Sequence, residues 1–179
     1  MRQILLLLFT CFALSAFAQQ SETYIKIAKQ LKPSDTLEIK EVFGNGKLKD
    51  SGTAYIYDFG EFYYRSTVGT FSQFDKKGTK IVESKFDDYG NYLSYILYDV
   101  DGHVLRSVIT RSIEITSEDP LDILKGKNLQ ILTDERVYRY SDKLCKHVLL
   151  KEGQRLNDKK IGTWTTYNED GTVKKEKEF

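Results

Sequence analysis

Short stretches of alternating apolar and polar residues recur along most of the chain, separated by polar turns that contain glycine. In the middle of the chain the pattern is regular. The motif aromatic-Asp-x-x-Gly begins at Phe74, Phe86 and Tyr98, so it repeats every twelve residues. Fixed self-similarity is typical of stacked supersecondary units rather than of a fold arranged around one active site. Each unit has room for a strand of about eight residues and a four-residue turn.

The turn residues predict how these strands are connected. An Asp at the first turn position accepts hydrogen bonds from backbone N–H groups two residues on, and a Gly at the fourth tolerates positive φ. A type I turn closed by a left-handed Gly is a hairpin loop with a β-bulge, and such tight loops make successive strands antiparallel neighbours. We therefore expect left-handed, structurally important glycines in four turns: Gly78, Gly90, Gly102 and Gly171.

The pattern as a whole predicts an all-β fold, a repeat-built, twisted antiparallel meander of consecutive hairpins with roughly eight to eleven strands. At most one or two short helices are expected. Residues 19–35 are an N-terminal arm or a short helix with Ser21 as N-cap, and a helical turn is expected at Pro120 with Asp119 as its cap. Residues 36–179 form a single β-repeat domain, because no low-complexity linker divides them. The pattern leaves open whether the sheet closes on itself.

Residues 1–18 are predicted to be a signal peptide. Arg2 supplies the basic start, residues 4–14 the apolar segment, and residues 16–18 a small-x-small cleavage site. The apolar segment is too short for a membrane span, so no transmembrane segment is expected after cleavage. The protein is then exported, to the periplasm or the extracellular space. Lipid anchoring through Cys11 is the less favoured alternative, because the residues before it fit lipid attachment poorly.

Charge and cysteine content narrow the classes of partner. The formal net charge is +1, and removal of Arg2 makes it zero. Binding to nucleic acid or to an anionic membrane surface would need a basic excess, so neither partner is expected. Cleavage would leave Cys145 as the only cysteine, which precludes an intramolecular disulfide. We expect its thiol to be buried and unreactive, because a free Cys usually packs as a small apolar side chain.

The C-terminal residues 156–179 contain Gly-x-Trp-x-x-Tyr, a polar turn ending in Gly and an alternating charged strand, with the motif residues Gly162, Trp164, Tyr167 and Gly171. This segment resembles the MORN-repeat variant of many exported bacterial proteins. A weaker resemblance covers residues 42–110, whose aromatic-Asp-x-x-Gly repeats lack the Gly-x-Trp element. The resemblance implies a sheet of consecutive hairpins used as a protein- or surface-interaction scaffold, antitoxin-like in some relatives, and it implies no catalytic residue set.

Trp164 is predicted to be the core anchor of this segment. A tight turn ending at Gly162 would lead into its strand, and Thr163 and Thr165 would project to the opposite, wet face. A buried large aromatic ring stabilises a fold by several kcal/mol, whereas an exposed one contributes little, so burial is favoured over ligand stacking.

The chain shows no pattern of a catalytic, cofactor or metal site. His103 and His147 lie in different predicted strands, without metal-ligand spacing to each other or to Cys145. There is no nucleophile elbow, phosphate-binding loop or His-Glu-x-x-His motif. Acidic pairs such as Asp87-Asp88 lie in predicted turns, where solvent keeps a carboxyl from acquiring the raised pKa of a general acid.

The aromatic residues are the best candidates for an interaction surface. Tyr55, Tyr57, Tyr92 and Tyr98 are weak binding candidates, although packing in the core of the sheet is favoured for them. The expected function is an exported, non-enzymatic β-repeat scaffold that binds a protein or cell-envelope component. The alternatives are a sugar- or small-ligand-binding β domain and, third, an exported hydrolase. An exposed aromatic patch on a flat sheet would favour the first, and a concave pocket with converging polar groups the second. The residues identify neither the partner nor the oligomeric state.

Overall fold

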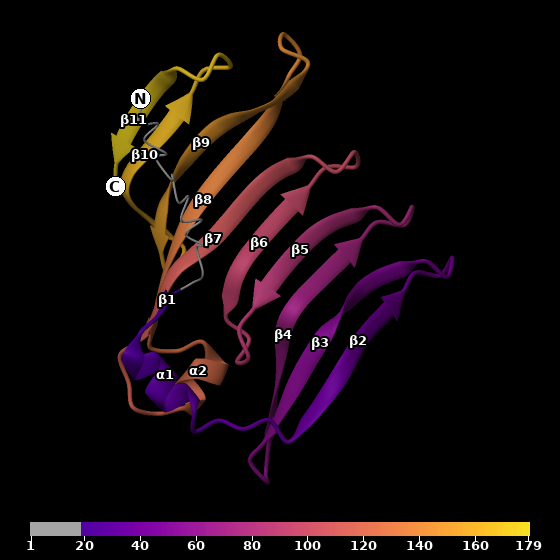
Figure 1. Cartoon of the computed structure of the whole chain (residues 1–179), viewed down its shortest axis with the longest axis vertical. Coiled ribbons are helices and arrows are strands. Elements are labelled where there is room, and N and C mark those ends of the chain that lie inside the picture. Colours follow the sequence, from indigo (N-terminus) through magenta and orange to yellow (C-terminus); the bar gives the residue numbers. More distant parts are fainter. Residues whose placement is uncertain (1–18) are drawn as a thin grey trace, which may run out of the picture.

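The computed structural model describes residues 19–179, so the predicted signal peptide and Cys11 lie outside the described residues. The fold is all-β, as predicted: eleven strands form one open sheet, accompanied by two short helices (Figure 1). Strands β2 to β11 follow one another in sequence order as an antiparallel meander, and β1 adds to β7 in parallel. The elements are β1 (Gln19–Gln20), α1 (Glu22–Ala28), β2 (Asp35–Val42), β3 (Leu48–Asp58), β4 (Tyr63–Phe74), β5 (Lys80–Phe86), β6 (Tyr92–Tyr98), β7 (Val104–Ile115), α2 (Leu121–Lys125), β8 (Leu129–Ser141), β9 (Lys146–Leu156), β10 (Lys159–Tyr167) and β11 (Val173–Glu178). None of the helices among these residues is long and apolar enough to cross a membrane.

The predicted turn geometry is confirmed. In each of four hairpins the Gly N–H donates to the carbonyl of the first turn residue, and the register shifts beside the turn as expected for a β-bulge. The Asp carboxylates of three of these turns accept from the backbone N–H two residues on, at 2.8 to 2.9 Å. The four glycines have φ angles of 85° to 93°: Gly78, Gly90, Gly102 and Gly171.

The short β5–β6 hairpin divides one end of the sheet. β4 pairs with β5 only as far as Gly69 opposite Phe86, and β6 pairs with β7 only as far as Ser94 opposite Ile109. Beyond these points β3–β4 and β7–β8 continue as two separate pairs, and both helices lie at this end (Figure 1). The main buried cluster joins the helices to both pairs and consists of Tyr24, Ile27, Ala28, Leu31, Tyr57, Ile113, Ile115, Ile123 and Leu129.

A buried carboxylate ties α1 to the β5–β6 turn. Tyr24 of α1 donates its hydroxyl proton to Asp87 Oδ2 at 2.6 Å, and the Asn91 amide donates to the Tyr24 hydroxyl at 2.8 Å. Burial, followed by the charge of Asp87, raises the pKa of Tyr24, so the phenol stays protonated as a donor. The expectation that both acids of this turn face solvent is therefore wrong for Asp87, which is 7% exposed, because α1 covers it. Asp88 is exposed.

The first helix confirms one sequence prediction and the second corrects another. Ser21 is the N-cap of α1, and its hydroxyl accepts from the Tyr24 N–H at 3.1 Å. In α2 the N-cap is Pro120 rather than Asp119. The Asp119 carboxylate still accepts from the Leu121 N–H at 2.9 Å, two residues on, which is the reach of a capping side chain.

Two further expectations are corrected at turns. The β9–β10 turn lies at Asn157 and Asp158, and Gly162 is inside β10, where its φ of 56° accompanies a register shift between β9 and β10. Gly162 is therefore a bulge residue and not the end of a turn. Cys145 is exposed rather than buried, because it occupies the β8–β9 turn with a φ of 50°.

Replacing a turn glycine by Val should destabilise the fold more at Gly90 than at Gly102. Both have positive φ, which strains a β-branched residue, and we expect each variant to lose about 1–2 kcal/mol. At Gly90 a Cβ would also lie 3.2 Å from Ser66 Cβ, whereas at Gly102 it would meet open space. Urea denaturation compares the two variants. Unchanged midpoints in both would contradict the role of these glycines.

Candidate functional site

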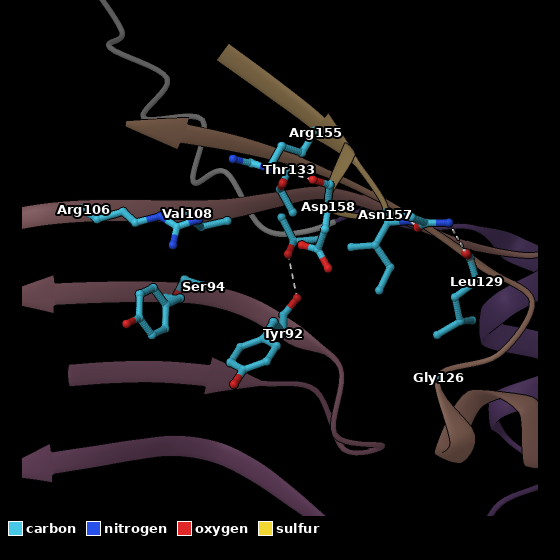
Figure 2. A pocket seen from close by; sticks show the side chains of 13 residues that line it. Tyr92, Ser94, Arg106, Val108, Gly126, Leu129, Thr133, Arg155, Asn157 and Asp158 are labelled. Atoms are coloured by element: carbon cyan, nitrogen blue, oxygen red, sulfur yellow. Dashed lines mark hydrogen bonds between the residues drawn. The ribbon is translucent and has the colours of Figure 1, made fainter. Parts of the chain in front are cut away.

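A groove on the sheet lies where β6 separates from β7; we call it the sheet groove (Figure 2). Its volume is about 470 Å³, and its walls come from β6, β7, β8 and β9, the β9–β10 turn and the residue that ends α2. The separation of the strands makes the groove, because the β7–β8 ladder continues to Ile115 opposite Leu129 after β6 has turned away. The Thr110 hydroxyl donates to the Tyr92 carbonyl at 2.6 Å and holds the two strands together at this point.

The lining of the sheet groove contains both apolar and polar side chains. Its apolar part comes from Val108, Leu129 and Ile131, with the rings of Tyr92 and Tyr95. Leu129 is buried and Ile131 packs against the main buried cluster, so this part of the groove is continuous with the core. The Tyr92 side chain is different, because the residue is 51% exposed and its ring contacts Phe86 with centroids 4.4 Å apart. A half-exposed aromatic ring beside a concave surface is a feature of ligand- and protein-binding sites.

Two arginines bring positive charge to the groove. Arg106 and Arg155 both line it, and both contact Glu135, which is 3% exposed on the intervening strand β8. Arg155 donates a hydrogen bond to Glu135 Oε2. Arg106 Nε lies 2.8 Å from Glu135 Oε1 as an ion pair, without a well-aligned hydrogen bond.

The Glu135 carboxylate is held in its charged form. Burial alone would raise its pKa, but the hydrogen bond from Arg155 and the positive charges of Arg106 and Arg155 outweigh burial and lower the pKa below its usual value. The Arg106 and Arg155 side chains are 41% and 24% exposed. Asp158 also lines the groove, so two arginines and two carboxylates meet at this end. The N–H groups of the arginines that Glu135 does not use can donate to a polar acceptor group.

The four tyrosines named as weak binding candidates are not brought together. Tyr57 is excluded as a binding residue, since it is 1% exposed and donates its hydroxyl proton to the Asp88 carbonyl. Tyr55 is half-buried against the main cluster, and Tyr98 is half-buried on β6. Only Tyr92 lines the sheet groove. Packing in the core was thus the correct prediction for Tyr57.

The sequence reasoning missed the charged centre of the groove. The three charged residues are far apart in sequence: Arg106, Glu135 and Arg155. They come together because β7, β8 and β9 are neighbouring strands. The register pairs Arg106 with Val137 across β7 and β8, and Glu135 with Gly153 across β8 and β9. These three residues belong to no short sequence motif that could have identified them. Only a correct strand register would have placed these side chains on one face.

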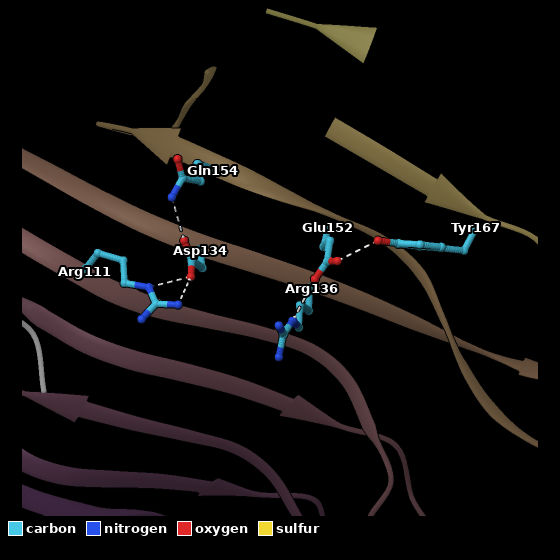
Figure 3. Close-up of polar contacts among 6 residues, drawn as sticks. All are labelled: Arg111, Asp134, Arg136, Glu152, Gln154 and Tyr167. Carbon is cyan, nitrogen blue, oxygen red and sulfur yellow. Dashed lines mark hydrogen bonds and ion pairs between the residues drawn. The ribbon is translucent and has the colours of Figure 1, made fainter. Parts of the chain in front are cut away.

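Another set of charged residues forms cross-strand pairs on the sheet (Figure 3). Asp134 accepts from Arg111 and from Gln154, and Glu152 accepts from Arg136 at 2.9 Å. Tyr167, a motif residue of the C-terminal segment, donates its hydroxyl proton to Glu152 at 2.7 Å, and this bond is the main cause that lowers the pKa of Glu152. Such exposed pairs each contribute at most about 1 kcal/mol.

Trp164 is a core anchor, as predicted. It is 5% exposed, its indole N–H donates to the Gln154 carbonyl at 3.0 Å, and Lys160 Nζ lies 4.3 Å from the ring centroid. Phe179 meets the ring edge-on at 6.4 Å, so Trp164 is enclosed by its own sheet and is not a free binding residue.

Comparisons with known proteins add little to this geometry. No protein-family model and no curated protein sequence matches the chain. One similar solved structure is a protein of unknown function from Bacteroides fragilis; it is 11% identical, the alignment covers 81% of this chain and 92% of that one, and the TM-score is 0.22.

Proposed function

We propose that this protein is an exported, non-enzymatic β-repeat scaffold that binds a protein or cell-envelope component through the sheet groove. The observation that carries the proposal is the composition of the groove: an apolar floor continuous with the core, a half-exposed Tyr92 ring and two arginines at one end. Interfaces use aromatic and Arg side chains of this kind as their main energetic anchors. Export and the scaffold role rest on the signal-peptide pattern and on the resemblance to the MORN-repeat variant.

Binding fits the groove better than catalysis. A general acid needs a raised pKa, but the pKa of Glu135 is lowered by its two arginines. Among residues 19–179 the groove lining contains no Cys and no His, so its hydroxyl groups lack the imidazole partner of the common nucleophile–base pairs. The groups that converge here can hold a partner in place by hydrogen bonds and apolar contact.

Tyr92→Ala should remove binding while the fold persists. The test immobilises the purified protein, exposes it to the envelope fraction of its own cells, identifies the retained partner by mass spectrometry and then measures its dissociation constant. We expect Tyr92→Ala to weaken that complex about tenfold, the loss expected for a moderate aromatic hot spot. Tyr140→Ala is the matched control, since Tyr140 is also 51% exposed but does not line the groove. Equal affinities in the two variants would contradict a binding role for the groove.

The second candidate is a sugar- or small-ligand-binding domain. It is favoured by the concave form of the groove, in which polar groups converge, and by the groove volume of about 470 Å³, which falls in the ordinary range for small-ligand sites. Glycan-array binding that is lost in Tyr92→Ala and kept in Tyr140→Ala, without any retained protein, would support this candidate over the first.

A further inference from the structure

The turn between β6 and β7 holds the Asp99 carboxylate in a fixed orientation. Asp99 Oδ1 accepts from the backbone N–H groups of Asp101 and His103, at 2.9 and 2.8 Å. The first turn of this kind does the same with Asp75 Oδ1, which accepts from the N–H groups of Lys77 and Thr79. In both turns one oxygen is used by the backbone, and Oδ2 is left to face whatever lies beside the turn.

Two imidazoles lie beside Asp99 Oδ2. His103 Nδ1 is 3.2 Å from it, and His147 Nε2 is also 3.2 Å from it. His103 is the residue directly before β7, whereas His147 is near the start of β9. His147 reaches the β6–β7 turn because β8 and β9 continue beyond the end of the β7–β8 pairing, which is Arg106 opposite Val137. In this extension His147 lies opposite Tyr140. The two histidine rings stack with centroids 4.5 Å apart.

The three atoms form a compact set of metal-type ligands. Asp99 Oδ2 and the two ring nitrogens all lie within 4.8 Å of one another. Tetrahedral bonds of about 2.0–2.2 Å to zinc separate neighbouring ligand atoms by roughly 3.3–3.5 Å, close to the nitrogen–oxygen distances of this cluster. Two imidazoles and one carboxylate suit zinc and its neighbours in the first transition row, and they do not suit calcium or magnesium, which take oxygen ligands.

The exposure of the two histidine rings decides how each of them can bind a metal ion. The His147 side chain is 15% exposed, and its other nitrogen, Nδ1, is buried without a partner among the described residues. Nε2 is therefore the nitrogen through which this ring can bind. His103 is 56% exposed, which gives a metal ion access from solvent.

We propose that Asp99, His103 and His147 bind a transition-metal dication of the zinc type. Three protein ligands leave a fourth tetrahedral position, and no further His, Cys, Asp or Glu ligand atom within residues 19–179 joins the cluster. Water or a group from a bound partner completes the coordination, as in open zinc sites.

Calorimetry with Zn²⁺ on the tag-free protein tests this site. We expect one Zn²⁺ per chain and no binding of Ca²⁺ or Mg²⁺. His103→Thr, which introduces the residue that the first turn has at Thr79, and His147→Gln should each weaken Zn²⁺ binding by about tenfold or more, since losing even an outer-shell partner of a ligand costs that much. Co²⁺ should give the intense visible absorption of a tetrahedral site in the unaltered protein and lose it in both variants.

Matched aspartate variants separate metal binding from turn stability. Asp99→Asn and Asp75→Asn alter equivalent turns, but only the first should abolish Zn²⁺ binding. Zn²⁺ should raise the melting temperature of Asp75→Asn and leave that of Asp99→Asn unchanged, because only a native state that binds the ion is stabilised by it. Failure of the unaltered protein to bind Zn²⁺, or a Zn²⁺ affinity of His103→Thr and His147→Gln that equals that of the unaltered protein, would overturn the site and leave the cluster as a hydrogen-bonded group.

Discussion

Trp164→Ala should lower the free energy of unfolding by about 3 kcal/mol or more, the range for truncating a large buried aromatic side chain. Trp164 is 5% exposed and is covered by Phe179 and by the Lys160 and Arg155 side chains. Truncation would remove these contacts and leave the Gln154 carbonyl without its indole donor. Chemical denaturation measures the loss. Blue-shifted emission that acrylamide quenches poorly would verify burial in the native protein, and red-shifted, freely quenched emission would contradict it.

Gly153 offers a control for the packing of this ring. A Cβ at Gly153 would lie 2.4 to 2.6 Å from the Trp164 ring atoms, closer than real contacts allow. Gly153→Ala should therefore destabilise the protein, and the penalty should shrink when Trp164 is Ala. A double-mutant cycle measures this coupling. Additive effects of the two substitutions would show that the ring does not pack on Gly153.

Asp87→Ala should destabilise the protein by about 3 kcal/mol, because it removes a buried charged acceptor and leaves its donors unpaired. Asp87 is 7% exposed and accepts from the Tyr24 hydroxyl, the Gln20 amide and the backbone N–H groups of Tyr89 and Asn91. These bonds attach the N-terminal residues to the β5–β6 turn. Loss of the acceptor should also speed amide hydrogen exchange in α1.

Asp75→Ala is the matched control for this prediction. Asp75 makes the same backbone hydrogen bonds in its turn, but among the described residues its side chain bonds to no other element. We therefore expect a clearly smaller loss of stability and unchanged exchange in α1. Similar midpoints for the two variants in urea would mean that the contacts between Asp87 and α1 contribute little.

The sequence was sufficient where the cause of a structure is local. The four hairpin turns were predictable because the Asp, or Asn168 in the last, lies within four residues of the Gly, and the hydrogen bonds close inside the turn. The same holds for α1, whose Ser21 cap and Tyr24 are three residues apart. Trp164 was predictable because strand alternation separates it from Thr163, which is exposed, and the indole is too large to leave in water without cost.

Long-range relations were not predictable in this way. The groove depends on where β6 leaves β7, and its charged centre depends on the registers of β7, β8 and β9. A local motif contains no information on how far each neighbouring strand extends. The expectation of solvent-facing acids failed at Asp87 for the same reason, because nothing in the turn itself shows that α1 covers it.

The three aspartates of the twelve-residue pattern separate what the local sequence determines from what only the tertiary structure determines. The sequence by itself determined that Asp75, Asp87 and Asp99 each give one oxygen to the backbone of their turns. Only the tertiary structure decided what the other oxygen meets: no described protein group at Asp75, the Tyr24 hydroxyl at Asp87 and two imidazoles at Asp99. The physical reason is that, apart from His103, which directly follows its turn, these partners come from elements as many as 63 residues away, placed by strand register and strand length and not by the turn.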